Sequence, residues 1–175
     1  MIEKLLKAAI RDVPDFPKPG IVFKDITPIL KDAALCNKVL DEFIQRLQHV
    51  SLDAVAGIES RGFLFGLMLA NRLGVPFVPI RKEGKLPGKT IRQSYALEYG
   101  CATMEMHADA FPSGSRVLIH DDLLATGGTV VAASELIKQL NGQVAAFSFI
   151  IALDFLGGEK RLIPYSDQLI SLINY

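Results

Sequence analysis

The sequence predicts an α/β fold in which helices flank a doubly wound, mainly parallel sheet. Patterns typical of buried strands alternate with helical patterns along most of the chain. Parallel neighbours in a sheet need a crossover connection, which is usually a helix. The chain has 175 residues, of which half are apolar, so it can bury one substantial core. We therefore expect a single domain over residues 1–175, without internal repeats.

The N-terminal part is predicted to be a helix followed by an extended cap. Apolar residues recur there at helical spacing, at Ile2, Leu5, Leu6, Ala9 and Ile10. Prolines from Pro14 to Pro19 then interrupt the pattern, and the irregular segment is expected to end near Pro28. This divides the domain into about residues 1–30 and a core of about residues 31–175.

The first half of the core begins with a helix predicted over Ala34–Gln48. Asp53–Ile58 has the composition of a buried strand, and Phe63–Leu73 is predicted to be a helix that ends at Gly74. The next strand is expected at Val75–Ile80. This strand, helix, strand order is the parallel crossover unit, and ligands of such sheets bind at the carboxyl ends of the strands.

A basic, glycine-bearing loop is predicted next, over residues 81–89 (RKEGKLPGK). The alternating stretches Gln93–Tyr99 and Ala102–His107 predict an antiparallel excursion from the sheet. A strand over Val117–His120 follows this excursion. The second half of the core closes with a helix, whose apolar face is Ala133, Leu136, Ile137 and Leu140, and with strands at Val144–Leu153 and Gln168–Leu172, the last at an edge.

Composition narrows the class of protein. Nineteen basic and nineteen acidic residues cancel, which argues against binding nucleic acid or an anionic membrane through overall charge. Cys36 and Cys101 form no metal-ligand or disulfide pattern, so we expect reduced thiols. The N-terminus lacks a signal-peptide pattern, and the apolar run Val144–Leu153 is too short to span a bilayer. These features predict a cytoplasmic protein.

A small-residue loop follows the strand at Val117–His120, within the stretch VLIHDDLLATGGT. Glycines at a strand-to-helix turn let backbone N–H groups converge, and the helix N-terminus adds a positive dipole end. The loop therefore suits a phosphate, with the Thr126 and Thr129 hydroxyls as further donors. Neither the nucleoside-triphosphate loop nor the dinucleotide glycine pattern is present. The residues of this phosphate loop are Ala125, Thr126, Gly127, Gly128 and Thr129.

Two carboxylates, Asp121 and Asp122, stand at the entrance to this loop. They would repel a phosphate unless they face hydroxyl groups or a divalent cation. The pattern therefore indicates a sugar phosphate, with the sugar diol against the acids. The structural alternative is a solvated strand end followed by an ordinary turn and helix cap.

This stretch resembles the phosphoribosyl pyrophosphate motif of the type I phosphoribosyltransferases. In that family the paired acids hold the ribose hydroxyls, and the following loop holds the 5-phosphate. His120 departs from the family pattern, in which an aliphatic residue usually precedes the acids, and we assign it no role. The resemblance also implies the fold of that family.

Two further segments resemble the adenine phosphoribosyltransferases of this family. Residues 57–63 (GIESRGF) resemble their pyrophosphate loop, which implies that the backbone of Glu59 and Ser60 and the side chain of Arg61 face pyrophosphate. Residues 81–89 resemble their dimer-interface loop, whose basic residues reach the partner's pyrophosphate site. The resemblance therefore implies a homodimer, and the basic residues assigned to pyrophosphate are Arg81, Lys82 and Lys85. Taken alone, such a charge run is more often a solvated face.

Residues 94–100 (SYALEYG) resemble the catalytic loop of the adenine enzymes. Glu98 would transfer a proton near the purine and Tyr99 would help to close the site, with Arg61 as the third catalytic residue. An exposed carboxylate on an edge strand is the structural alternative for Glu98.

Residues 14–26 resemble the N-terminal hood of the same family, which supplies the base pocket. By this resemblance, Phe23 and Leu123 sandwich adenine, while backbone groups of Val22 and Lys24 read its edge. Without the resemblance, Phe23 would be interpreted as a packing residue.

The resemblance extends from the N-terminal helix to the last strand and implies a glycosyltransferase of purine salvage. The implied reaction transfers the 5-phosphoribosyl group of 5-phosphoribosyl 1-pyrophosphate to N9 of adenine, giving AMP and pyrophosphate. Mg²⁺ is expected to bind mainly through the substrate, so no residue is assigned as a metal ligand. The alternatives are a phosphoribosyltransferase for another base and a non-catalytic regulator that senses phosphoribosyl pyrophosphate.

Overall fold

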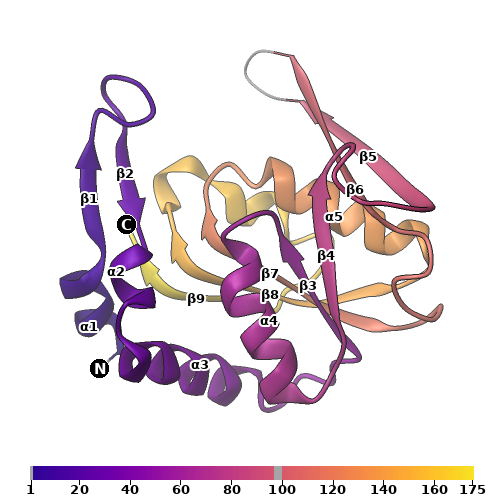
Figure 1. The fold of residues 1–175 in the computed structure, drawn as a ribbon, viewed down its shortest axis with the longest axis horizontal. Helices are drawn as coiled ribbons and strands as arrows, with labels where there is room; N and C mark the ends of the chain where they lie inside the picture. Colours follow the sequence, from indigo (N-terminus) through magenta and orange to yellow (C-terminus); the bar gives the residue numbers. More distant parts are fainter. Residues whose placement is uncertain (1, 97–99) are drawn as a thin grey trace.

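A mainly parallel sheet forms the centre of the protein, as the sequence predicts. The computed structural model describes residues 2–96 and 100–175. The strands of the sheet are β3 (Ala54–Ile58), β4 (Phe77–Lys82), β5 (Thr90–Ala96), β6 (Cys101–His107), β7 (Arg116–Leu124), β8 (Gln143–Ala152) and β9 (Leu169–Asn174). Within the described residues they lie in the order β5-β6-β4-β3-β7-β8-β9 (Figure 1). The pairs β4·β3, β3·β7, β7·β8 and β8·β9 are parallel, whereas β6 pairs antiparallel with β4 and β5.

Helices cover both faces of this sheet. The crossover helix α4 (Gly62–Leu73) joins β3 to β4, and α5 (Gly128–Gln139) joins β7 to β8. Helices α1 (Ile2–Ala9), α3 (Ala33–Leu47) and α4 pack on one face of the sheet and form the first hydrophobic core with it. Helix α5 packs on the other face and forms the second core. Adjacent residues of β7 point to opposite faces, so Leu118 belongs to the first core and Ile119 to the second. The doubly wound prediction is confirmed.

The N-terminal segment is more regular than the sequence analysis predicted. Strands β1 (Arg11–Pro14) and β2 (Val22–Asp25) form an antiparallel hairpin, and the short helix α2 (Thr27–Leu30) follows. Pro17 and Pro19 lie in the hairpin connection, where a missing backbone N–H breaks no ladder bond. Gly20 adopts a φ of 87° in this connection, and its N–H donates to Asp15 Oδ1 at 2.8 Å. The hairpin β1–β2 is a separate two-stranded sheet, and Figure 1 shows it at the opposite side of the molecule from the β5–β6 hairpin.

Three other boundaries differ from the prediction in ways that matter for the site. Strand β7 continues to Leu124, so the two acids lie in the strand and not in a turn. Strand β4 continues to Lys82, so the first two residues of the predicted basic loop, Arg81 and Lys82, lie in the sheet. Two 3₁₀ turns, η1 (Asp154–Leu156) and η2 (Gly158–Arg161), follow β8 and were not predicted. No helix among residues 2–96 and 100–175 has the length and apolarity that crossing a bilayer requires.

Candidate functional site

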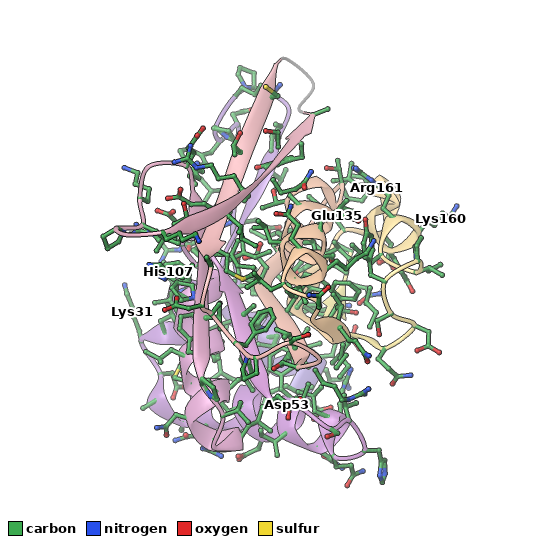
Figure 2. The ribbon with its side chains drawn as sticks, turned by 90° about the vertical axis from the view of Figure 1, so that its right-hand side faces the viewer. Lys31, Asp53, His107, Glu135, Lys160 and Arg161 are labelled. Carbon is green, nitrogen blue, oxygen red and sulfur yellow. The ribbon has the colours of Figure 1, made fainter. Side chains whose placement is uncertain are left out.

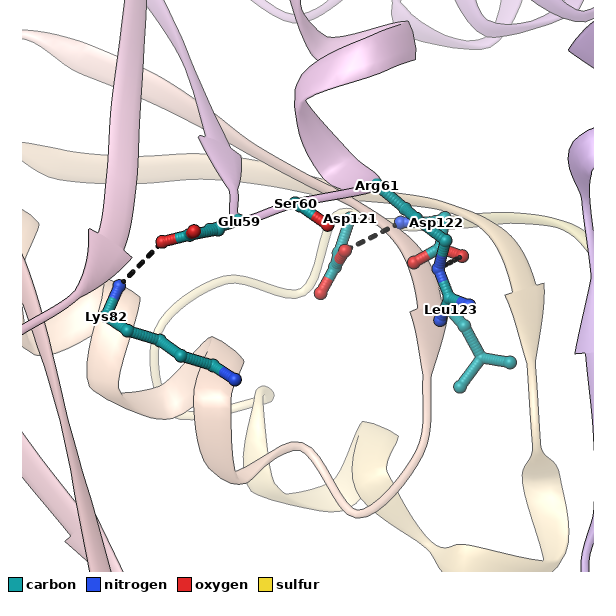
Figure 3. A pocket seen from close by; sticks show the side chains of 7 residues that line it. All are labelled: Glu59, Ser60, Arg61, Lys82, Asp121, Asp122 and Leu123. Carbon is teal, nitrogen blue, oxygen red and sulfur yellow. Dashed lines mark hydrogen bonds and ion pairs between the residues drawn. The ribbon is translucent and has the colours of Figure 1, made fainter. Parts of the chain in front are cut away.

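The carboxyl ends of β3, β4 and β7 surround a cavity of about 380 Å³. Figure 3 shows the seven residues that line it: Glu59, Ser60, Arg61, Lys82, Asp121, Asp122 and Leu123. These residues come from three segments that are distant in the sequence, and the parallel pairing of β3 with its two neighbours brings them together. Six of them were predicted to contact pyrophosphate or ribose, and the seventh, Leu123, was predicted to contact adenine.

The acid pair, Asp121 and Asp122, lines the cavity from β7. The backbone N–H of Asp122 donates to Asp121 Oδ1 at 2.9 Å, and the Asp122 residue is only 4% exposed. Burial raises the pKa of both carboxyl groups, and repulsion from Asp122 raises the pKa of Asp121 further. Among the described residues, Asp122 Oδ2 has an ion-pair partner but no hydrogen bond of good geometry. Such a pair is suited to accept hydrogen bonds from the hydroxyl groups of a ligand.

Gly62 lets the N-terminus of α4 approach the acid pair closely. A Cβ at this position would lie 2.9 Å from Asp121 Oδ1 and 2.9 Å from the carbonyl oxygen of His120. Real Cβ atoms rarely come this close to a neighbour, so only glycine allows the two junctions to meet without a shift.

Arg61 connects the acid pair to the N-terminal hairpin. Its Nε lies 2.7 Å from Asp122 Oδ2, and its guanidinium lies 4.7 Å from the centroid of the Phe23 ring. The resemblance implies that the Arg61 side chain faces pyrophosphate. In this structure Arg61 lines the cavity, forms an ion pair with the second acid and covers one face of the aromatic ring predicted to bind adenine.

Glu59 organises the opposite wall of the cavity. Its carboxylate accepts hydrogen bonds from Arg81 Nη2 at 3.0 Å and from the backbone N–H of Lys82 at 3.0 Å. The hydrogen bond from Arg81 is the largest influence on the Glu59 carboxyl and holds its pKa below the usual value. The peptide bond between Glu59 and Ser60 is cis. Lys82 lines the cavity. Arg81 and Lys85, both predicted to bind pyrophosphate, are not among the seven described residues that line it; Arg81 binds Glu59 and the carbonyl oxygen of Lys85.

The phosphate loop follows the acids but does not line the same cavity. Gly127, with a φ of 78°, precedes the first residue of α5, so the loop leads directly into the helix N-terminus. The hydroxyl of Thr129 donates to Tyr95 Oη at 3.3 Å, and Thr126 is exposed. The first N–H groups of an α-helix have no partner within the helix, so the N-terminus of α5 gives this loop donors suited to a phosphate.

The turn η2 packs tightly against the phosphate loop, a contact that the sequence analysis missed. A Cβ on Gly158 would meet the carbonyl oxygen of Ala125 at 2.2 Å. Arg161, at the end of η2, donates from Nη1 to the carbonyl oxygen of Thr126 at 3.1 Å. The adjacent glycines 157 and 158 were the available signal, because consecutive glycines after a strand often mark a close approach of two backbones.

The predicted adenine residues occupy the hairpin side of the site. Phe23 contacts the Phe16 ring edge to face at 5.2 Å, and Val22 is 50% exposed. Lys24 forms an ion pair with Asp12 at 2.7 Å. Leu123 is the predicted adenine contact that lines the cavity itself. Glu98 and Tyr99 lie outside the described residues.

His120, which precedes the acids, points into the core away from the cavity. Its ring packs edge to face against Phe43 at 5.5 Å, and Nδ1 lies 2.9 Å from Ser148 Oγ. Burial is the main influence and lowers the pKa of His120 to about 3, so the ring is neutral at physiological pH. Its position is that of a packed side chain.

The comparisons with known proteins agree on one family. The model of the phosphoribosyl transferase domain matches residues 25–168. The adenine phosphoribosyltransferase of Cytophaga hutchinsonii is 54% identical over 175 residues, which cover 100% of this chain and 97% of that protein. The crystal structure of adenine phosphoribosyltransferase from Thermoanaerobacter pseudethanolicus has a TM-score of 0.95 at 50% identity and 100% coverage of both chains. That of the Saccharomyces cerevisiae enzyme, complexed with adenine, has a TM-score of 0.91 at 42% identity and 98% coverage of both chains.

Proposed function

The chain belongs to the adenine phosphoribosyltransferases of the phosphoribosyltransferase family, and on this premise we propose that it converts adenine and 5-phosphoribosyl 1-pyrophosphate to AMP and pyrophosphate. The observation that carries the proposal is the convergence of the acid pair and the 59–61 segment in one cavity. The acids and the following loop suit a ribose 5-phosphate, and the opposite wall suits pyrophosphate. This reaction belongs to purine salvage.

The ribose end of the substrate is bound by β7 and the loop that follows it. Asp121 and Asp122 accept hydrogen bonds from the ribose hydroxyl groups, and this contact stabilises carboxylates whose burial otherwise disfavours their charge. The 5-phosphate binds the backbone N–H groups and hydroxyls of Ala125 to Thr129.

Pyrophosphate, the leaving group, is bound by the opposite wall. The backbone of Glu59 and Ser60 and the side chains of Arg61 and Lys82 line this part of the cavity. When the ribose hydroxyl groups donate hydrogen bonds to Asp122, Arg61 leaves its ion pair with Asp122 and binds pyrophosphate. Negative charge grows on pyrophosphate in the transition state, so cationic groups fixed beside it lower the barrier.

Mg²⁺ enters with the substrate in this proposal. The described residues contain no group of three or more His, Cys, Asp or Glu side chains that could hold a metal ion. Mg²⁺ usually keeps several waters and binds substrate phosphates, so pyrophosphate oxygens and water would supply most of its ligands. When bound, the ion neutralises and orients the pyrophosphate.

The base binds between the hairpin and β7. Phe23 and Leu123 sandwich adenine, and backbone groups of Val22 and Lys24 read its edge. Stacking requires that Arg61 release the face of Phe23 that it covers, or that adenine use the other face. Glu98 transfers the proton near the purine, and Tyr99 helps to exclude water from the activated sugar.

The direct test is to incubate the protein with adenine, phosphoribosyl pyrophosphate and Mg²⁺ and to measure AMP formation. Parallel reactions with hypoxanthine, guanine and orotate test base choice. We expect turnover with adenine far above that with the other three bases, and none in the matched Asp122→Ala variant. A preference for another base, or no nucleotide formation from any of the four, would exclude this function.

A cytoplasmic homodimer is part of the same proposal. The family resemblance of residues 81–89 supports a dimer, and the exposed apolar residues Leu64 (42%) and Leu67 (57%) on α4 offer a surface that association would cover. Cys36 and Cys101 are free thiols, as in proteins of reducing compartments. Sedimentation velocity measures the oligomeric state directly, and a monomer at micromolar concentration would refute the dimer.

A further inference from the structure

A charged residue lies buried behind the wall of the cavity that faces pyrophosphate. Glu105 lies in β6 between Met104 and Met106, and all three are at most 1% exposed. Aspartate and glutamate are almost never fully buried unless they are paired, because removing a carboxylate from water is costly. Specific partners must therefore compensate for the burial of Glu105.

These partners are backbone groups of the basic loop, defined here as residues 83–89. Glu105 Oε1 accepts the N–H of Lys85 at 2.9 Å and the N–H of Leu86 at 2.8 Å. On the other side, Oε2 lies 3.4 Å from Thr90 Oγ1 and 3.6 Å from Arg92 Nε. Burial raises the pKa of Glu105, but the backbone N–H groups and Arg92 outweigh it and hold the pKa below the usual value. The group is therefore ionised at neutral pH.

Two further residues of the basic loop bind side chains of β5 and β6 close to Glu105 in the sheet. Arg92, next to Glu105, also binds Glu83 at 2.7 Å. His107, labelled in Figure 2, lies on the same strand as Glu105, and its Nε2 is 3.0 Å from the carbonyl oxygen of Pro87. The buried carboxylate thus holds the backbone of the loop at Lys85 and Leu86, and the Lys85 residue itself is exposed.

A continuous series of hydrogen bonds leads from Glu105 to the cavity. Glu105 holds the N–H of Lys85, and the carbonyl oxygen of Lys85 accepts from Arg81 Nη1 at 3.0 Å. Arg81 in turn donates from Nη2 to Glu59, which lines the cavity. Arg81 and Glu105 are also direct neighbours in the β4·β6 pairing. The shape of the loop is therefore coupled to the position of Arg81 beside Glu59.

We propose that Glu105 is a positioning residue for the pyrophosphate end of the substrate. It folds the basic loop around its carboxylate and thereby fixes Arg81, Lys82 and Lys85 relative to Glu59. The inference rests on the proposed function, since that function places pyrophosphate at this wall. Loss of the acceptor oxygen that holds the N–H groups of Lys85 and Leu86 should weaken contacts to pyrophosphate and leave the ribose 5-phosphate and adenine contacts intact.

The test compares Glu105→Ala with Glu105→Gln. In Glu105→Ala we expect the KM for phosphoribosyl pyrophosphate and the Ki for pyrophosphate to rise by about tenfold to a hundredfold, the scale of a displaced binding group. The Kd for AMP, which carries no pyrophosphate, should stay at the wild-type value. Glu105→Gln should remain near wild type, because one amide oxygen can accept both N–H groups that now bind Oε1. Added formate should partly restore Glu105→Ala by refilling the anion position.

Asp53→Ala is the matched control. Asp53 also accepts a backbone N–H, from Arg116 at 2.8 Å, but it lies at the far end of the molecule from the β5–β6 hairpin (Figure 2). This variant should lose stability without a change in the KM for phosphoribosyl pyrophosphate. If Glu105→Ala does not fold, Glu105→Asp, which is one methylene too short to reach both N–H groups, replaces it with the same expected result.

Two sets of outcomes separate the inference from the function on which it rests. If the wild type is active, two results would overturn the positioning role alone. One is an unchanged Ki for pyrophosphate in Glu105→Ala, and the other is a loss of AMP affinity as large as the loss of pyrophosphate affinity. If the wild type makes no nucleotide, the proposed function fails. Calorimetric titration of wild type and Glu105→Ala with magnesium pyrophosphate then still decides whether Glu105 positions an anion site: equal affinities overturn it, and weaker binding to the variant supports it.

Discussion

Replacing Gly158 with alanine tests how the phosphate loop is held. Gly158 begins the 3₁₀ turn that packs on the loop, and a Cβ there would lie 2.2 Å from the carbonyl oxygen of Ala125. It would also lie 3.1 Å from the backbone nitrogen of Gly127 and 3.1 Å from Leu124 Cδ1. Two of these three atoms belong to the backbone of the phosphate loop, so no side-chain rotation can relieve the contact.

The size of the effect follows from this geometry. Real Cβ contacts are essentially never shorter than 3.0 Å, so the turn and the loop must separate by about 0.8 Å. Overpacking of this kind costs about 1–3 kcal/mol, and a shift near 1 Å in a binding loop can cost about a hundredfold in activity. We therefore expect a melting temperature lower by about 2–4 °C for each kcal/mol lost, and weaker binding of ribose 5-phosphate.

Gly157→Ala is the matched control, because a Cβ there meets no atom within 4 Å. Gly157 has a φ of 65°, so alanine costs about 1–2 kcal/mol of backbone strain without touching the loop. Thermal unfolding and calorimetric titration with ribose 5-phosphate and with pyrophosphate separate the two effects. Both variants should be less stable, but only Gly158→Ala should lose affinity for ribose 5-phosphate. Normal ribose 5-phosphate binding by Gly158→Ala, or equal loss in both variants, would refute the reasoning.

Three further predictions concern charges in and near the site. Asp121→Asn should raise the free energy of unfolding at pH 7 by about 0.5–2 kcal/mol, because burial and repulsion raise the pKa of Asp121 and make its ionised form unfavourable. Thermal unfolding should show this gain at pH 7 and not in acid, where Asp121 is protonated. The variant should also bind phosphoribosyl pyrophosphate more weakly. Burial lowers the pKa of His120 to about 3, so between pH 6.5 and pH 5 the unfolded chain binds a proton that the folded chain does not. The free energy of unfolding of the wild type should therefore fall by about 2 kcal/mol over this range. In urea unfolding, His120→Val should lack this loss. Glu98→Ala should lower turnover about a hundredfold in the AMP assay, and near-normal turnover would reject proton transfer by Glu98.

The alternation of strands and helices could be predicted because it depends on local spacing. The helix ended by Gly74 agrees with the structure, where Gly74 has a φ of 68°. The N-terminal hairpin could not be predicted in this way, because prolines mask the strand pattern and the pairing of Val13 with Phe23 involves residues ten positions apart. The end of β7 was also predicted too early, since Asp121 and Asp122 are polar residues in a strand whose partner β8 is apolar.

The residue types of the site were determined by the sequence alone. Two adjacent acids before a loop of small residues indicate a sugar phosphate, and the resemblance of residues 57–63 to a known pyrophosphate loop assigns Arg61 to an anion. Tertiary structure decided which of these groups meet. Arg61 pairs with Asp122, Gly158 supports Ala125, and Glu105 holds the loop that carries Lys85. These contacts join segments that are distant in the sequence. Parallel pairing of β3 with β7 brings Arg61 to Asp122, whereas β6, which carries Glu105, pairs antiparallel with β4.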